Sequence, residues 1–185
     1  MIERIERREL IKLGVALTGI GVVESAGAQE TTTEQETTTQ GEATTLFVAA
    51  LSGVEQNPPV ETPATGLAIF AVGEDGVDYS LAVANVENVI MAHVHLGGPD
   101  ENGPVGVWLY PSVDAREPEL RQGESNGVIA QGTITSDEFV GPLDGESLSV
   151  LLDAMRSEEA YVNVHTQQNE AGEIRGQTRP VETLL

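Results

Sequence analysis

The chain of 185 residues contains no cysteine, and beyond residue 12 it contains no lysine. Without cysteine there is no disulfide framework, no thiol nucleophile and no lipid attachment of the lipoprotein type. Aromatic residues make up only 4% of the chain. The core must therefore be mainly aliphatic, and an aromatic platform for carbohydrate is disfavoured. Neither a Gly-x-Ser-x-Gly elbow nor a phosphate-binding loop occurs, so the common signatures of hydrolases and nucleotide-binding enzymes are missing.

The composition is strongly acidic, with 30 aspartate and glutamate residues against 9 lysine and arginine residues and a formal net charge of −21. A lysine-free acidic surface is typical of proteins that work in concentrated salt, where self-repulsion is screened over a few ångströms. We therefore expect a halophilic protein; a disordered acidic tail is the alternative, but the acids are spread through patterned strands. The same charge disfavours nucleic acid and anionic membrane surfaces as partners.

Residues 1–28 are typical of a signal peptide for twin-arginine export. Arg7 and Arg8 precede an apolar run over 13–23, and small residues at 26–28 provide a cleavage site. The run is shorter than the roughly 20 apolar residues that span a membrane, so we expect no membrane span after cleavage. The mature protein is predicted to be secreted, extracellular or at the cell surface. An amphipathic first helix and an uncleaved anchor are the alternatives.

The rest of the chain divides into a spacer, one domain and a tail. Residues 29–44 are rich in Thr, Glu and Gln and contain no apolar residue larger than alanine, which predicts a disordered spacer. One domain is predicted over 45–180, followed by a C-terminal tail at 181–185. Short apolar runs broken by turn residues predict a mainly β fold, an antiparallel sandwich or barrel, with a hairpin turn at 73–76. The expected strands cover 45–52, 66–72, 78–84, 89–96, 105–110, 127–135, 161–166 and 173–178.

One short α-helix is predicted near residues 146–156. Its apolar residues Leu148, Leu151, Leu152 and Met155 recur at the spacing of one helical face. We interpret this stripe as core packing.

All three histidines of the chain lie in two of the predicted strands. Met91, His93 and His95 share one strand face because side chains alternate, and Asn163 and His165 share a face of another strand. Two imidazoles at this spacing can chelate one ion, with a third supplied across the sheet. Copper or zinc suits such a set, with Met91 as a candidate axial ligand for copper. Alternatively, the histidines only form hydrogen bonds inside the fold, His165 to Asn163 or to a backbone carbonyl.

The last predicted strand places Glu173 and Arg175 on one face. Arg175 is expected to pair with Glu173 or a neighbouring acid and so anchor the strand. The alternative is that its guanidinium orients an anionic ligand beside His165. Together with Asn163, these residues are predicted to support the histidines rather than to bind an ion themselves.

The loop over 97–104 is rich in glycine and proline, which indicates a tight and rigid connection. Because it follows the strand with His93 and His95, it could shield or shape a metal site. Asp100 and Glu101 on this loop are weaker candidates for oxygen ligands, since acids are abundant throughout the chain.

The segments AHVHLGGPDENGPVGVWL and YVNVHTQQNEAGEIRGQ resemble the paired signatures of the CHRD domain, the module named after chordin. The shared elements are A-H-V-H-x-G, N-G-P, Y-x-N-V-H-T and G-E-I-R-G-Q, and the resemblance covers about residues 45–178. It implies an antiparallel β-sandwich similar to that of copper/zinc superoxide dismutase, with H-V-H resembling the copper-ligand strand of those enzymes. Three histidines are too few for their dinuclear copper/zinc site.

In animals, CHRD modules belong to an extracellular antagonist of growth factors and are regarded as interaction or structural units. The resemblance therefore favours a secreted binding or structural module that holds one copper or zinc ion, with an unknown extracellular protein or surface component as partner. A mononuclear-copper redox enzyme and a ligand-free cell-surface domain are the alternatives. An enzyme is the less favoured interpretation.

Overall fold

The computed structural model describes residues 45–181. The predicted signal peptide over 1–28, the spacer over 29–44 and all but the first residue of the tail at 181–185 lie outside this range. Export and life in high salt therefore stay predictions. Within the described range, no helix has the length and apolar character needed to cross a membrane.

The described residues form eight strands, one α-helix and three short 3-10 helices. The strands are β1 (Leu46–Ser52), β2 (Thr65–Val72), β3 (Val77–Leu96), β4 (Val105–Tyr110), β5 (Arg121–Ile134), β6 (Ala160–Thr166), β7 (Ile174–Gln177) and β8 (Arg179–Pro180). The helices are η1 (Gly53–Glu55), η2 (Ser136–Glu138), η3 (Gly141–Leu143) and α1 (Leu148–Arg156). The helix predicted near 146–156 is confirmed by α1, and the predicted hairpin by the antiparallel pairing of β2 with β3.

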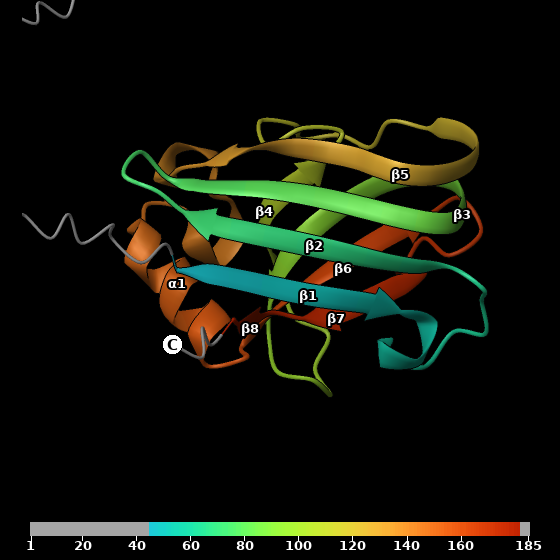
Figure 1. The fold of residues 1–185 in the computed structure, drawn as a ribbon, viewed down its shortest axis with the longest axis horizontal. Helices are drawn as coiled ribbons and strands as arrows, with labels where there is room; N and C mark the ends of the chain where they lie inside the picture. The colour runs from blue at the N-terminus through green and yellow to red at the C-terminus, as the bar shows by residue number, and fades with distance from the viewer. Residues whose placement is uncertain (1–44, 182–185) are drawn as a thin grey trace, which may run out of the picture. The chain divides into compact units, whose positions relative to one another are not determined.

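Five of the strands close into an antiparallel ring. Strand β2 pairs with β1 and β3, β6 pairs with β3 and β7, and β7 returns to β1. Strands β4 and β5 extend β3 outside the ring. Figure 1 shows β5, β3, β2 and β1 side by side in one layer, β6 and β7 behind them, and α1 at one end. The mainly β, antiparallel prediction is confirmed, whereas the predicted superoxide dismutase-like sandwich is not, because hydrogen bonding joins both layers into a barrel.

Strand β3 makes this closure possible. The sequence predicts two strands, 78–84 and 89–96, separated by asparagines, but the structure has one strand of 20 residues. Asn85 and Asn88 adopt positive φ angles of 56° and 53°, a conformation that asparagine tolerates better than most residues. The strand bulges here and continues, so its first half pairs with β2 and β5 and its second half with β6 and β4.

The core fills the inside of the barrel with aliphatic and a few aromatic side chains. Phe70, Leu81, Val94 and Val164 are completely buried, and each contributes roughly 1.5–3 kcal/mol relative to an exposed side chain. Helix α1 adds the buried Leu151 and Met155, which confirms the predicted core-facing stripe. Strand β6 is buried along its whole length, so its outward, polar face is also covered. That covered polar face holds the candidate site.

Candidate metal centre

The three histidines come together on β3 and β6, as the alternation of side chains predicts. The two strands pair antiparallel, with Met91 opposite His165 and His93 opposite Asn163. His95 belongs to the next pair on the same face of the sheet. Directly opposed residues project from the same face of a sheet. The register therefore places all of these side chains on the outward face of the barrel.

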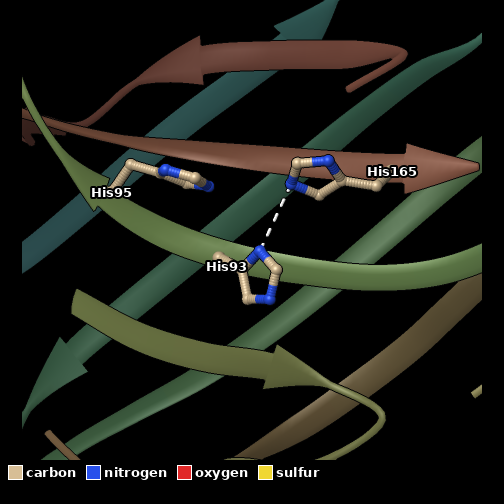
Figure 2. Close-up of side chains that lie close together, drawn as sticks. All are labelled: His93, His95 and His165. Atoms are coloured by element: carbon tan, nitrogen blue, oxygen red, sulfur yellow. Dashed lines mark hydrogen bonds between the residues drawn. The ribbon is translucent and has the colours of Figure 1, made fainter. Parts of the chain in front are cut away.

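The imidazoles form a compact, buried group (Figure 2). A nitrogen from each ring lies within 4.8 Å of a nitrogen from the other two, and the histidines are only 2% (His93), 8% (His95) and 5% (His165) exposed. His93 Nδ1 lies 3.2 Å from His165 Nε2. Among the described histidine, cysteine and acidic residues, this is the one cluster with the spacing of a metal site.

Backbone carbonyls fix the orientation of two of the rings. Nδ1 of His95 lies 2.9 Å from the carbonyl oxygen of Gly103, and Nδ1 of His165 lies 2.9 Å from that of Glu170. Because a carbonyl only accepts, both Nδ1 atoms carry the proton and both Nε2 atoms present a lone pair. Such outer hydrogen bonds are the usual way in which proteins orient histidine ligands of metals. His93 then donates its Nδ1–H to His165 Nε2.

Two nitrogens of the cluster have no protein partner. His93 Nε2 and His95 Nε2 are buried without a hydrogen bond, and Ser125 Oγ is the third such side-chain atom among the described residues. Leaving a buried polar atom unpaired costs about 1–3 kcal/mol. A cation among the three rings would satisfy His95 Nε2, and it would take the place of the proton between His93 Nδ1 and His165 Nε2 (Figure 2), so the residues present fit a metal ion.

The electrostatics of the cluster favour neutral imidazoles. Burial, followed by repulsion from His165 and His95, lowers the pKa of His93 from 6.5 to about 2. Burial also lowers the pKa of His95 to about 4, although its bond to Gly103 acts in the opposite direction. Burial likewise lowers the pKa of His165. The histidines are therefore unprotonated near neutral pH, which is the form that binds metals.

Two aromatic rings enclose the histidines. Trp108 on β4 meets His93 edge to face, with ring centroids 4.3 Å apart. Tyr161 on β6 stacks on His95, with centroids 4.9 Å apart and ring planes 11° from parallel. The guanidinium carbon of Arg175 lies 3.5 Å from the centroid of the Tyr161 ring. Arginine, tyrosine and histidine thus form one continuous stack that ends at the cluster.

The predicted pairing of Arg175 with Glu173 is wrong. Arg175 is 1% exposed and donates to the Gly98 carbonyl at 2.7 Å and to Asn102 Oδ1 at 3.3 Å. Glu173 instead accepts hydrogen bonds from Thr62 and Thr166. Both side chains lie on the covered face, but Arg175 bonds to the loop over 97–104, whereas Glu173 bonds to Thr62 and to the end of β6. The predicted anchoring role of Arg175 survives with a different partner.

The loop over 97–104 covers the cluster. The sequence suggested this shielding position, because the loop directly follows the strand with His93 and His95. Gly103 accepts from His95 through its carbonyl and donates its N–H to the Tyr161 hydroxyl at 3.0 Å. Asp100 and Glu101 remain exposed and do not join the cluster. The alternative of oxygen ligands from this loop therefore finds no support.

The structure also places the predicted supporting residue Asn163, the remaining ring contact of His165, and Met91. Asn163 accepts from Gln56 at 2.7 Å and donates to the Ala171 carbonyl, so it connects β6 to two covering segments. His165 bonds to a backbone carbonyl, one of the two partners considered from the sequence, and not to Asn163. Met91 is half-buried beside the cluster in register with His165.

Sequence reasoning missed Gln56 and Trp108 and did not assign Tyr161 a role. Tyr161 has the same alternation as Asn163 and His165, so its place on this face was available from the pattern. Trp108 and Gln56 reach the site from a neighbouring strand and a distant loop. No local pattern in the sequence marks either residue.

The fold and the site define a small antiparallel β module with a buried histidine cluster under a covering loop. A model of the family described as "CHRD domain" matches residues 47–178. That match spans most of the chain and includes every residue of the cluster, and the chain belongs to the CHRD domain family. Neither the search of curated proteins nor that of solved structures gave a match.

Proposed function

We propose that this protein is an extracellular binding module that holds one copper or zinc ion through His93, His95 and His165. The observation that carries the proposal is the buried, unpaired Nε2 atom of His95, which lies in one cluster with a nitrogen of His93 and a nitrogen of His165. The ring orientations support it, because carbonyls occupy Nδ1 of His95 and His165 and leave Nε2 as the ligand atom. All-nitrogen sets of this kind suit copper and zinc.

The ligand-free alternative accounts for part of the geometry. The contact between His93 Nδ1 and His165 Nε2 is a satisfactory hydrogen bond without any ion. This hydrogen bond, however, uses only the lone pair of His165 Nε2 and leaves the buried Nε2 atoms of His93 and His95 unpaired. A purely structural cluster would be improved by replacing those lone pairs with apolar atoms, so the metal proposal explains more of the site.

We propose a resident ion rather than a redox centre that turns over substrate. The three histidines are at most 8% exposed, and they are enclosed by the loop over 97–104, Trp108 and Tyr161. A substrate would have to displace the covering loop to reach the ion. Binding or structural use of the ion requires no such movement, and this favours the module over the mononuclear-copper enzyme.

The test is the metal content of the protein, expressed without a histidine tag and purified in high salt. We expect about one equivalent of copper or zinc by elemental analysis, as a single three-histidine site requires. The double variant His93→Ala/His95→Ala should contain none. Val94→Ala is the matched control, because Val94 lies between the two histidines on the opposite, core-facing side of β3. This control disturbs packing but keeps all three nitrogen donors.

Retention of the ion by the double variant would place the metal elsewhere. Absence of metal from the folded parent protein, together with failure to take up added Cu(I), Cu(II) or Zn(II), would overturn the proposal. The histidines would then serve only to hold the covering loop.

A further inference from the structure

The candidate site offers no negative charge to an ion. Its ligands are three neutral imidazoles, and no carboxylate of the described residues lies within the cluster. The free energy needed to transfer an ion from water into a buried site rises with the square of the charge. A divalent ion is therefore penalised much more than a monovalent one, unless an anion accompanies it.

The charge that ring contacts connect to the cluster is positive. Arg175 lies against the Tyr161 ring, and Tyr161 stacks on His95, so the guanidinium is within about 8 Å of the His95 imidazole. No carboxylate in the described part of the chain forms an ion pair with Arg175 at 4 Å or less.

Carboxylates at greater distance weaken this field but do not cancel it. Glu55 and Asp100 are the acids that act on Arg175, and both side chains are exposed to solvent. Charges in water are screened, increasingly so at high salt, whereas the 1% exposed Arg175 is not. The large negative charge of the protein as a whole is screened in the same way.

We infer that the histidine site selects copper(I) over zinc(II) and copper(II), and that Arg175 is the residue that sets this preference. The inference rests on the proposed metal site and names its ion. A monovalent ion suits neutral, buried ligands beside a fixed positive charge. Met91 adds to the preference, because thioether sulfur favours copper(I) and its position opposite His165 puts it on the same face.

The size of the effect follows from the distance. With an effective dielectric constant of about 20, a positive charge about 8 Å away weakens binding by up to about thirtyfold for each unit of charge on the ion. A divalent ion feels this twice. Removing the charge should therefore shift the ratio of copper(I) to zinc(II) affinity by roughly ten- to thirtyfold in favour of zinc.

The test measures both affinities on the metal-free protein. Copper(I) binding is measured anaerobically in competition with bicinchoninate, and zinc(II) binding in competition with a chromogenic zinc chelator. The parent protein should bind copper(I) more tightly than zinc(II). Arg175→Gln should lower the ratio of these affinities roughly tenfold or more, whereas Arg175→Lys, which keeps the charge, should preserve most of it.

Arg179→Gln is the matched control. Arg179 is an exposed arginine on the adjoining β8 and pairs with Glu158, so its loss removes the same charge without altering the buried stack. Its affinity ratio should equal that of the parent protein. Denaturation curves establish that each variant is folded.

The outcomes separate the two proposals. Failure of the parent protein to bind copper(I) or zinc(II) here, or copper(II) in the uptake test of the proposed function, overturns the metal site itself. Binding of zinc(II) as tightly as copper(I) by the parent protein overturns only the selectivity, and this holds even where Arg175→Gln does not fold. An unchanged ratio in folded Arg175→Gln overturns the role of Arg175.

Discussion

Tyr161 and His95 lie ring against ring, with centroids 4.9 Å apart and planes 11° from parallel. The Tyr161 hydroxyl also accepts the N–H of Gly103, whose carbonyl accepts from His95 Nδ1. One tyrosine therefore fixes both the plane of an imidazole and the loop that orients it. The side chain therefore has two functions, and that of the hydroxyl can be removed on its own.

We predict that Tyr161→Phe lowers the free energy of unfolding by about 0.5–1.5 kcal/mol, because it leaves the partly buried Gly103 N–H without this partner. Metal affinity should change little, since the stack on His95 is kept. Tyr161→Leu also removes the stack and the contact with Arg175, and should cost about 3–5 kcal/mol. Urea denaturation and metal titration of both variants provide the measurement. Equal stability of the two variants would show that the stack contributes nothing.

Gly103 is predicted to be intolerant of any side chain. A Cβ at this position would overlap the backbone carbonyl of Leu96, so Gly103→Ala must displace the loop and with it the partner of His95. We expect a loss of about 2–4 kcal/mol in the free energy of unfolding and weaker metal binding. Gly73→Ala is the control, since its Cβ would meet nothing closer than 3.6 Å. A Gly103→Ala variant as stable as this control would contradict the close approach.

Trp108 is predicted to report on the occupation of the site. It is the single tryptophan of the chain, and its ring centroid lies 4.3 Å from that of His93. Copper(II) held at the cluster should quench the fluorescence of Trp108 strongly. A paramagnetic, redox-active ion at this distance gives the excited indole ring an additional non-radiative route of decay. Zinc(II) should quench little. His93→Ala should lose the copper response, and persistence of full quenching in that variant would place the ion elsewhere.

The stability of the metal-free protein should depend on pH through the histidines. The folded-state pKa is about 4 for His95 and about 2 for His93, both below 6.5. The unfolded state therefore binds more protons at mildly acidic pH, so stability is complete above about pH 6.5 and falls as the pH is lowered towards 4. Each histidine contributes up to roughly 1.4 kcal/mol per pH unit in this interval.

The measurement is the free energy of unfolding from urea titrations between pH 7 and 5 at constant salt. His95→Gln should show a shallower decline than the parent protein, because one of the titrating groups is gone. The carboxylates are the same in both proteins, so their contribution cancels in the comparison. Identical slopes would mean that His95 is protonated as easily in the folded state as in the unfolded state.

The sequence predicted the elements well where a local pattern carries the information. The four apolar residues of the helix lie on one face, and α1 begins and ends within a few residues of the predicted bounds. Strand β4 has the predicted bounds, 105–110. The pattern failed at β3 and β5. The asparagines at 85 and 88 suggested a break in β3, but they only bend it. Residues 121–126 are polar and were not predicted as strand, but they form the start of β5 and pair with β3 at that bend.

The histidine cluster was partly predictable for the same reason. Alternation alone puts His93 and His95 on one face, and it puts His165 on one face with Asn163. Whether those two faces coincide depends on the register of β3 against β6, which the pattern does not contain. The structure supplies that register, with His93 opposite Asn163.

By itself, the sequence determined the composition of this protein's site: only three histidines, no thiolate, and the short strands that carry them. Local rules suffice for this, because the period of a strand and the absence of cysteine need no distant partner. Only the tertiary structure decided what surrounds the histidines. Strand pairing and the loop over 97–104 bring Trp108, the Gly103 carbonyl and the Arg175 stack to the cluster. These contacts depend on strand register and loop conformation, which no local pattern specifies.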